Sequence, residues 1–329
     1  MSLAKPRALL VGMAVFATAC IGTPVLAQDG AALGDSLVTA FKHRDFVGAV
    51  RFADSLLERN AGDVDALTLK GRALSSLGRF EEGYAVLSEA VSLAPAAVEP
   101  RLFRGVNRLL AEDPAGAVDD LNAAAEIAPG APVVMDMQAA ALFRAKRYPE
   151  AVAVLDDLVA MGYDAITTLQ TRSEVKYRAG NVEGALEDAN RAIAIAPGAA
   201  QGYRVLGEIH LREGKTPEAL KDFNRAIELE KESEMSELRA TAYVNRAYTR
   251  LVLNDQAGAA GDIRKGLELD PENPFAYRNR ALLRIEAGNT EAACSDLRTA
   301  LRHDFYTKYG QEAIYGDDAH ELVEQHCNG

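Results

Sequence analysis

The sequence lacks the short motifs that mark most catalytic centres. Its 329 residues contain no Gly-rich phosphate loop, no Gly-x-Ser-x-Gly and no His-Glu-x-x-His. Basic residues are also in deficit, with 36 lysines and arginines against 48 acidic residues and a net charge of −12. Nucleic acids and anionic membranes require a basic surface, so this balance disfavours both. The sequence therefore predicts a protein that is not an enzyme, has no cofactor and does not bind nucleic acid.

Long apolar runs are scarce, and the one near the N-terminus has the features of a secretory signal. Lys5 and Arg7 precede an apolar segment, residues 8–19, that is too short for a stable membrane anchor. Val-Leu-Ala at 25–27 fits the small-x-small pattern before a cleaved bond. We expect a signal peptide over residues 1–27 and a periplasmic or secreted mature chain without a membrane span. Removing Lys5 and Arg7 changes the net charge from −12 to −14.

Cys20 leaves a second interpretation of this segment open. The residues before it, Ala-Thr-Ala, make a poor lipoprotein box, because the usual leucine three positions ahead of the cysteine is missing. Lipidation of Cys20 would anchor the chain in the cell envelope. Either route takes the chain out of a bacterial cytoplasm.

Small residues recur in the chain every 34 positions, with a single step of 40. A period near 34 is typical of stacked-repeat proteins. The first series is Ala49, Gly83, Ala117, Ala151, Ala185, Ala219, Ala259 and Ala293. The second series is Leu37, Gly71, Gly105, Ala139, Ser173, Gly207, Ala247 and Ala281.

One period contains two amphipathic helices. Residues 65–77 and 80–93 each place leucine, valine or tyrosine on one face. Gly78 stands between them, where a helix end favours a residue that tolerates positive φ, and Pro95 ends the second helix. We expect the two series of small residues to lie where the two helices cross, because a large side chain there would push the helix axes apart.

This pattern resembles the tetratricopeptide repeat, a helix–turn–helix unit of 34 residues. The resemblance covers roughly residues 30–305 and implies an all-α, right-handed superhelical solenoid of about eight repeats. We expect the array to occupy 28–305 and a C-terminal cap to occupy 306–329. The repeats are expected to start at Gly30, Val64, Val98, Pro132, Ile166, Ala200, Ala240 and Pro274.

Three places depart from the family pattern. The first repeat has Ser36 and Leu37 where leucine and a small residue are expected, as is common at the end of an array. The fourth repeat lacks its proline. Six extra residues lie within 231–239, which predicts a longer helix or, as an alternative, a hinge.

Cys294 and Cys327 remain in the mature chain. An isolated pair in an oxidising compartment is usually a disulfide, which would fasten a short helix at 317–327 to the last repeat. The ends of other exported bacterial repeat proteins are similar. Two free thiols are one alternative. A metal site formed by His320, Glu321, His326 and Cys327 is another, but their spacing matches no common site and we predict no metal site.

The family resemblance places positions 2, 5, 6, 9, 12 and 13 of each first helix on the concave side. In the third and fourth repeats these positions are mostly apolar, and in the fifth to eighth they are rich in arginine, asparagine and tyrosine. They predict a groove for an extended, partly acidic peptide. The residues expected to bind the partner are Phe103, Arg178, Arg204, Asn245, Tyr248, Arg278 and Asn279.

Other interpretations of these residues stay open. The arginines can instead pair with Glu174, Glu208 and Glu286, and Phe103 can pack within the array. His210 is expected to be a packed core histidine, and most carboxylates are expected to be solvated. The sequence favours a non-catalytic protein-interaction scaffold that binds a protein or peptide partner. The alternative is a lipid-anchored subunit that assembles or regulates cell-wall or outer-membrane machinery.

Overall fold

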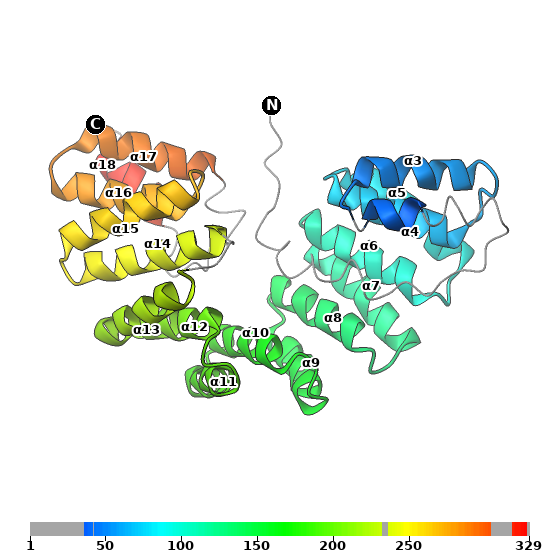
Figure 1. Ribbon diagram of the computed structural model, residues 1–329, viewed down its shortest axis with the longest axis horizontal. Coiled ribbons are helices and arrows are strands. Elements are labelled where there is room, and N and C mark those ends of the chain that lie inside the picture. Colours follow the sequence, from blue (N-terminus) through cyan, green and yellow to red (C-terminus); the bar gives the residue numbers. More distant parts are fainter. Residues whose placement is uncertain (1–35, 42, 232–235, 304–317, 328–329) are drawn as a thin grey trace. The chain divides into compact units, whose positions relative to one another are not determined.

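The computed structural model describes residues 36–41, 43–231, 236–303 and 318–327, and all their regular structure is α-helical (Figure 1). This confirms the all-α prediction. A helical turn at 36–41 precedes the longer helices. These are α3 Phe46–Leu57, α4 Val64–Ser76, α5 Phe80–Leu93, α6 Val98–Leu110, α7 Pro114–Ile127, α8 Pro132–Arg144, α9 Tyr148–Ala160, α10 Ala165–Arg178, α11 Val182–Ile195, α12 Ala200–Arg212, α13 Thr216–Leu229, α14 Ser236–Val252, α15 Gln256–Leu269, α16 Pro274–Glu286, α17 Thr290–Arg302 and α18 Asp318–His326.

The helices pack as hairpins in two compact units, unit 1 up to Tyr163 and unit 2 from Asp164. Within each unit, the first helix of a hairpin contacts its own second helix and the first helix of the next hairpin. The first helices α4, α6 and α8 therefore form one layer of unit 1, and α10, α12, α14 and α16 form the equivalent layer of unit 2. We call these the inner layers. This pairing is typical of a tetratricopeptide-repeat solenoid.

Small residues in the first helices make room for large ones in the second. A Cβ added to Gly105 would lie 2.7 Å from the nearest side-chain carbon of Leu121. One added to Gly207 would lie 2.8 Å from the ring of Phe223. Phe223 is fully buried, so neither it nor the backbone has space to move. The glycines are therefore required for close helix crossing.

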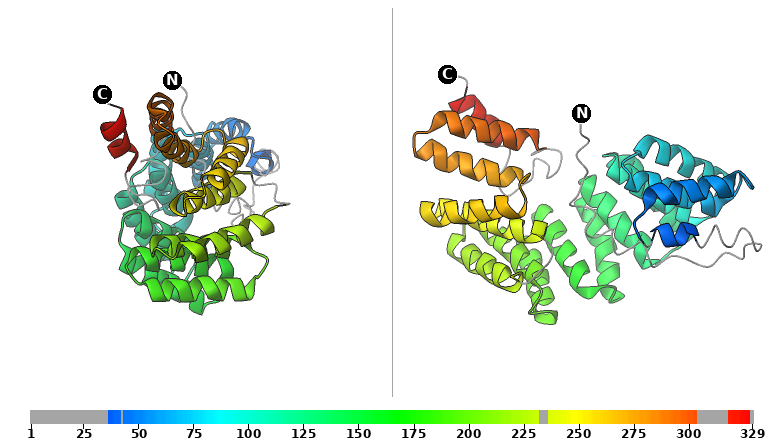
Figure 2. Two further views of the ribbon diagram at one scale, coloured as in Figure 1. Left: turned by 90° about the vertical axis from the view of Figure 1, so that its left-hand side faces the viewer. Right: turned by 45° about the horizontal axis from the view of Figure 1, so that its top comes forward.

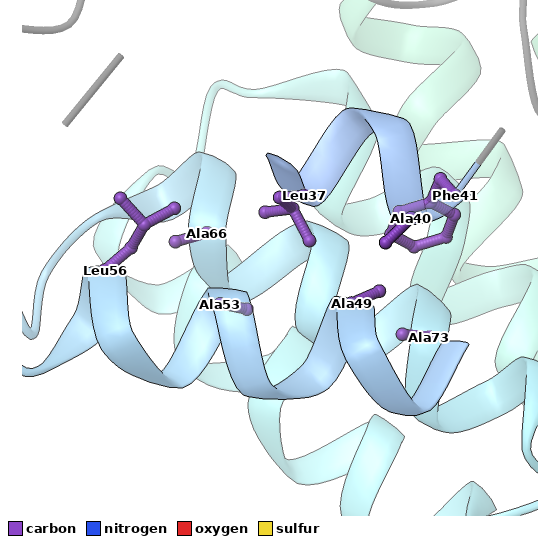
Figure 3. Packing of buried hydrophobic residues seen from close by; sticks show 8 residues of the cluster. All are labelled: Leu37, Ala40, Phe41, Ala49, Ala53, Leu56, Ala66 and Ala73. Carbon is purple, nitrogen blue, oxygen red and sulfur yellow. The ribbon is translucent and has the colours of Figure 1, made fainter. Parts of the chain in front are cut away.

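The first hairpin reverses this arrangement. Leu37 stands where the other repeats have a small residue, and it is buried in one cluster with Ala53 and Leu56 (Figure 3). Ala53 in turn occupies the place of Leu121 in the third repeat. The large and small residues have exchanged helices, which keeps the total volume of the core.

Turns with left-handed backbone end the first helices. Gly78 has a φ of 75°, as the sequence predicted. The connection after α9, where the fourth repeat lacks its proline, contains Gly162 and Asp164 with φ values of 68° and 34°. The two compact units divide in this connection, between Tyr163 and Asp164. The six extra residues coincide with a longer helix, since α14 has 17 residues and the first helices on either side of it have 13.

The C-terminal helix α18 packs against α17, as predicted for a cap (Figure 2). Its Leu322 and Val323 lie against the buried cluster that includes Leu297. Cys327, directly after the helix, is paired with Cys294 as a disulfide, with the Cα atoms 5.6 Å apart. None of the helices in the described part of the chain is long and apolar enough to cross a membrane. The predicted signal peptide and Cys20 lie outside the described residues.

Candidate interaction surface

Six of the seven predicted partner-binding residues lie in the inner layer of unit 2. Arg204, Asn245, Arg278 and Asn279 are buried, and Arg178 and Tyr248 are half-buried. Arg278 is only 2% exposed, so its charge must be compensated within the protein. These side chains therefore form a polar layer inside the helix stack, and they are not freely solvated groups on its surface.

Arginines and carboxylates alternate across α10, α12 and the end of α13. Arg178 Nε donates to Glu174 Oε1 at 2.6 Å, and Arg212 Nη1 lies 3.6 Å from Glu174 Oε2. Arg204 Nε lies 3.3 Å from Glu230 Oε1. We refer to the following six residues as the arginine–carboxylate cluster: Glu174, Arg178, Arg204, Glu208, Arg212 and Glu230. The expected alternative, pairing of the arginines with carboxylates of the chain, accounts for these contacts.

Several polar atoms of this cluster lack hydrogen bonds. In the described part of the chain, the buried side-chain atoms without a hydrogen-bond partner are Arg204 Nε, Arg212 Nη1, Glu230 Oε2 and Arg101 Nη1. The first three belong to the arginine–carboxylate cluster. Each such atom costs about 1–3 kcal/mol of stability. The two arginine atoms thus lie within ion-pair distance of carboxylates without forming hydrogen bonds, and one carboxylate oxygen of Glu230 accepts none.

Glu208 lies at the centre of this cluster. Its Oε1 accepts a hydrogen bond from Asn245 Nδ2 at 3.0 Å, which links α12 to α14. Burial raises the pKa of Glu208, while Arg212 and Arg204 act to lower it and Glu174 acts to raise it. Burial also raises the pKa of Glu230, against the opposing effect of Arg204. Both carboxyl groups therefore hold a proton more readily than a solvated glutamate.

Tyr248, Arg278 and Asn279 form a second group on α14 and α16. Arg278 Nη1 donates to Asn279 Oδ1 at 3.0 Å, and its guanidinium carbon lies 4.7 Å from the centre of the Tyr248 ring. Asn279 Nδ2 donates to the carbonyl oxygen of Val244 at 3.1 Å. Asn279 thus bonds the backbone of the neighbouring repeat, which accounts for its complete burial.

Phe103 belongs to unit 1 and has different surroundings. The guanidinium carbon of Arg72 lies 4.0 Å from the centre of the Phe103 ring and 5.0 Å from that of Phe41. Arg72 therefore stacks between aromatic rings of the first and third hairpins. The sequence indicated an apolar surface over the third and fourth repeats, and Arg72 stands at position 9 of the second repeat, whose positions were left out of that interpretation.

The sequence interpretation missed a set of buried aspartates. Asp188 is buried, and it accepts from Arg172 Nε at 2.7 Å and lies 2.8 Å from Lys176 Nζ. The expectation that most carboxylates are solvated is therefore wrong for this position of the repeat. The signal was a spacing of 16 residues between arginine and aspartate, which recurs in Arg104–Asp120, Arg172–Asp188, Arg246–Asp262 and Arg280–Asp296.

His210 occupies in the sixth repeat the place that Lys176 has in the fifth, 12 residues before the aspartate. Its Nδ1 lies 2.7 Å from Asp222 Oδ2, and the ring is half-buried. Burial raises the pKa of Asp222, and the bond to His210 opposes this. The histidine is thus a partner of the half-buried Asp222, where the expectation from sequence was a packed core histidine.

No group of three or more histidine, cysteine, aspartate or glutamate residues suited to a metal ion occurs in the part of the chain that the structure describes. Cys327, which the alternative metal interpretation used, is paired with Cys294.

Comparison with known proteins gives repeat matches and structural neighbours. The family described as "Tetratricopeptide repeat" matches residues 64–96, 171–234 and 207–274. No curated protein matches the sequence. Among solved structures, yeast Tom70 is 15% identical with a TM-score of 0.69, and the similarity covers 93% of this chain and 66% of that one.

Two further structures share the fold. The APC/C hetero-tetramer Cut9–Hcn1 is 15% identical with a TM-score of 0.59, covering 90% of this chain and 55% of that chain. A tetratricopeptide repeat protein from Parabacteroides merdae is 16% identical with a TM-score of 0.54, covering 91% and 100%. The chain thus spans little more than half the length of the Cut9–Hcn1 chain. Identities this low show the fold alone, and together with the repeat matches they support a tetratricopeptide-repeat protein.

Proposed function

We propose that this protein is a non-catalytic scaffold that binds a partner protein through an extended segment on the inner layer of unit 2. Repeat arrays of this kind expose extended binding surfaces, which gives the proposal its general basis. The observation that carries it is the group of buried polar atoms in the arginine–carboxylate cluster that lack a hydrogen bond. Donors about two turns apart on one helix suit a chain of carbonyl or carboxylate oxygens.

The spacing of these donors defines the length of segment that fits. Arg204 and Arg212 are eight residues apart on α12, which corresponds to about 12 Å along the helix axis. An extended peptide covers this distance with about four residues. Arginine favours oxygens presented in a plane, so backbone carbonyls and acidic side chains both meet its geometry. The acceptor Glu230 Oε2 suits a backbone N–H of the same segment.

We place the scaffold in the bacterial periplasm. The apolar segment and the Val-Leu-Ala site before Gln28 support export, and the pairing of Cys294 with Cys327 suits an oxidising compartment. A lipidated Cys20 and an envelope-assembly role are the second candidate. The intact mass of the mature protein separates them, because cleavage before Gln28 removes Cys20 and lipidation retains it with added acyl chains.

Photo-crosslinking in living cells tests the binding surface. A photoreactive residue replaces half-buried Tyr248 in one variant, Phe103 in a second, and Glu228 in a control. Glu228 lies on the second helix of the sixth hairpin with 69% of its side chain exposed. We expect a discrete crosslinked partner at Tyr248 and not at Glu228, with the yield reduced by Arg212→Met in a folded protein. Crosslinks within the chain alone at Tyr248 would contradict the proposal.

A further inference from the structure

The inner layer of unit 2 contains carboxylates that compete with an acidic ligand for the arginines. Glu174, Glu208 and Glu230 stand against three arginines, so the arginine–carboxylate cluster has no net charge when all six side chains are ionised. A ligand carboxylate added to this cluster would bring a fourth negative charge into a site with little access to water. Such a group binds well only when one internal carboxylate loses its charge.

Glu208 is placed to be that group. Glu174 and Glu230 lie within 4 Å of arginine nitrogens, whereas Glu208 accepts a hydrogen bond from the uncharged Asn245 amide. The charges that act on Glu208 come from its own helix through Arg204 and Arg212, and from α10 through Arg178 and Glu174. From the end of α13, Glu230 faces Arg204, and Arg239 on α14 acts on Glu230. Protonation of Glu208 leaves the cluster with three cations and two anions.

We infer that Glu208 is a proton-controlled gate, so that the inner layer of unit 2 takes up an acidic peptide together with one proton on this carboxyl group. The inference rests on the proposed binding surface and adds its ligand chemistry and its regulation. With Glu208 ionised, Arg204 and Arg212 are balanced by internal charge. With Glu208 protonated, the cluster has a net positive charge that a ligand carboxylate neutralises, and Arg204 Nε and Arg212 Nη1 are the donors in it that lack a hydrogen bond.

Burial favours the protonated form of Glu208, so the cost of this proton uptake is already reduced in the folded chain. The sign of the pH dependence follows from linkage. Because the proton is taken up with the ligand, affinity rises as pH falls, until Glu208 is protonated in the free protein as well.

The test uses the full-length mature protein and a labelled decapeptide that alternates glutamate with glycine. The same peptide with glutamine in place of glutamate is the ligand control. We expect the wild-type protein to bind the acidic peptide more tightly at pH 5 than at pH 7.5. Glu208→Gln, which keeps the shape of the side chain, should bind it about tenfold more tightly at pH 7.5, with a flattened pH profile. Calorimetry in two buffers of different ionisation enthalpy should show proton uptake only in the wild type.

Two matched variants test whether the effect is specific to Glu208 or follows from removing any negative charge. Glu228→Gln removes one negative charge outside the cluster and should leave binding unchanged. Glu174→Gln removes a charge inside the cluster and should tighten binding while the dependence on pH persists, because Glu208 is still present. Three results would each overturn the gate. The first is equal affinity of wild type and Glu208→Gln at pH 7.5, and the second is a pH profile retained in Glu208→Gln. The third is that no variant binds the acidic peptide.

The outcome is separable from that of the proposed function. A partner crosslinked at Tyr248 with equal yield in wild type and Glu208→Gln would leave the scaffold in place and remove the gate. Loss of crosslinking at Tyr248 in every variant would remove the proposed binding surface, whatever the peptide measurements show.

Discussion

The inner layers of the two units hold their arginines in opposite ways. In unit 1, Arg72 lies between the rings of Phe41 and Phe103. In unit 2, Arg204 and Arg212 lie within ion-pair distance of Glu230 and Glu174, but the nitrogen atoms concerned form no hydrogen bond. The face of an aromatic ring attracts a guanidinium group without forming hydrogen bonds to it. A buried carboxylate that is poorly aligned with a guanidinium leaves some of its N–H groups without a hydrogen bond. The same hairpin scaffold thus holds one arginine between aromatic rings in unit 1 and pairs others with carboxylates in unit 2.

The largest loss of stability is expected when the buried Arg172–Asp188 ion pair of unit 2 is broken, because this pair is more deeply buried than its equivalent in unit 1. Asp188→Asn in unit 2 leaves Arg172 and Lys176 without their carboxylate, and only 8% of the Arg172 side chain is exposed. We expect a loss of about 3–5 kcal/mol in the free energy of unfolding, measured by chemical denaturation with hydrogen exchange to locate it in unit 2.

Asp120→Asn is the matched change in unit 1. Water reaches its partner Arg104 more easily, since 19% of that side chain is exposed. The loss should therefore be smaller than for Asp188→Asn. Equal losses in the two variants would mean that burial does not set the strength of these pairs.

The next largest loss of stability is expected when the disulfide that holds the C-terminal cap is removed. Cys327→Ser removes the bond that closes the 33-residue separation between Cys294 and α18. We expect unit 2 to lose about 3–4 kcal/mol and unit 1 to be unaffected, as measured by hydrogen exchange of the two units. A reductant should reproduce the change in the wild type and have no effect on the variant. Protection lost equally in both units would contradict the local character of the cap.

The smallest effect is expected for the cation of unit 1. Arg72→Met keeps an unbranched side chain between the rings and removes the charge, so we expect a loss of about 1–2 kcal/mol in thermal or chemical unfolding. Arg79→Met is the control, because Arg79 pairs with Glu82 on the surface with 47% of its side chain exposed. That change should cost close to nothing. A similar loss in both variants would show that stacking on Phe41 and Phe103 contributes nothing of its own.

The fold was predictable from the sequence because its determinants are local. The 34-residue period, the glycines at hairpin turns and the small residues at helix crossings act over one or two hairpins. Helices accordingly begin at Val64, Val98, Pro132, Ala200 and Pro274, where the repeats were expected to start. Even the poor match of the first repeat follows a physical rule, since Leu37 and Ala53 exchange large and small volumes within one core.

The candidate surface was predictable only in part. Family positions placed Arg204 and Asn245 in the inner layer, but they could not give their burial. Arg204 is paired with Glu230, which stands at the end of α13 beside the six-residue insertion, and a sequence pattern does not give the path of an insertion. The pairing of Arg172 with Asp188 had a visible signal in its spacing of 16 residues. It was missed because a charged residue on a helix is solvated in most cases.

The spacing of these arginine–aspartate pairs also bears on how such a chain can grow. Each aspartate is held by cations of its own hairpin, so Asp188 joins α10 to α11 and Asp296 joins α16 to α17. Duplication of a whole hairpin therefore copies both members of the pair together. A gene that gains or loses one whole hairpin in this way leaves none of these aspartates without its counterion, so changes in the length of the array are tolerated at this position of the repeat.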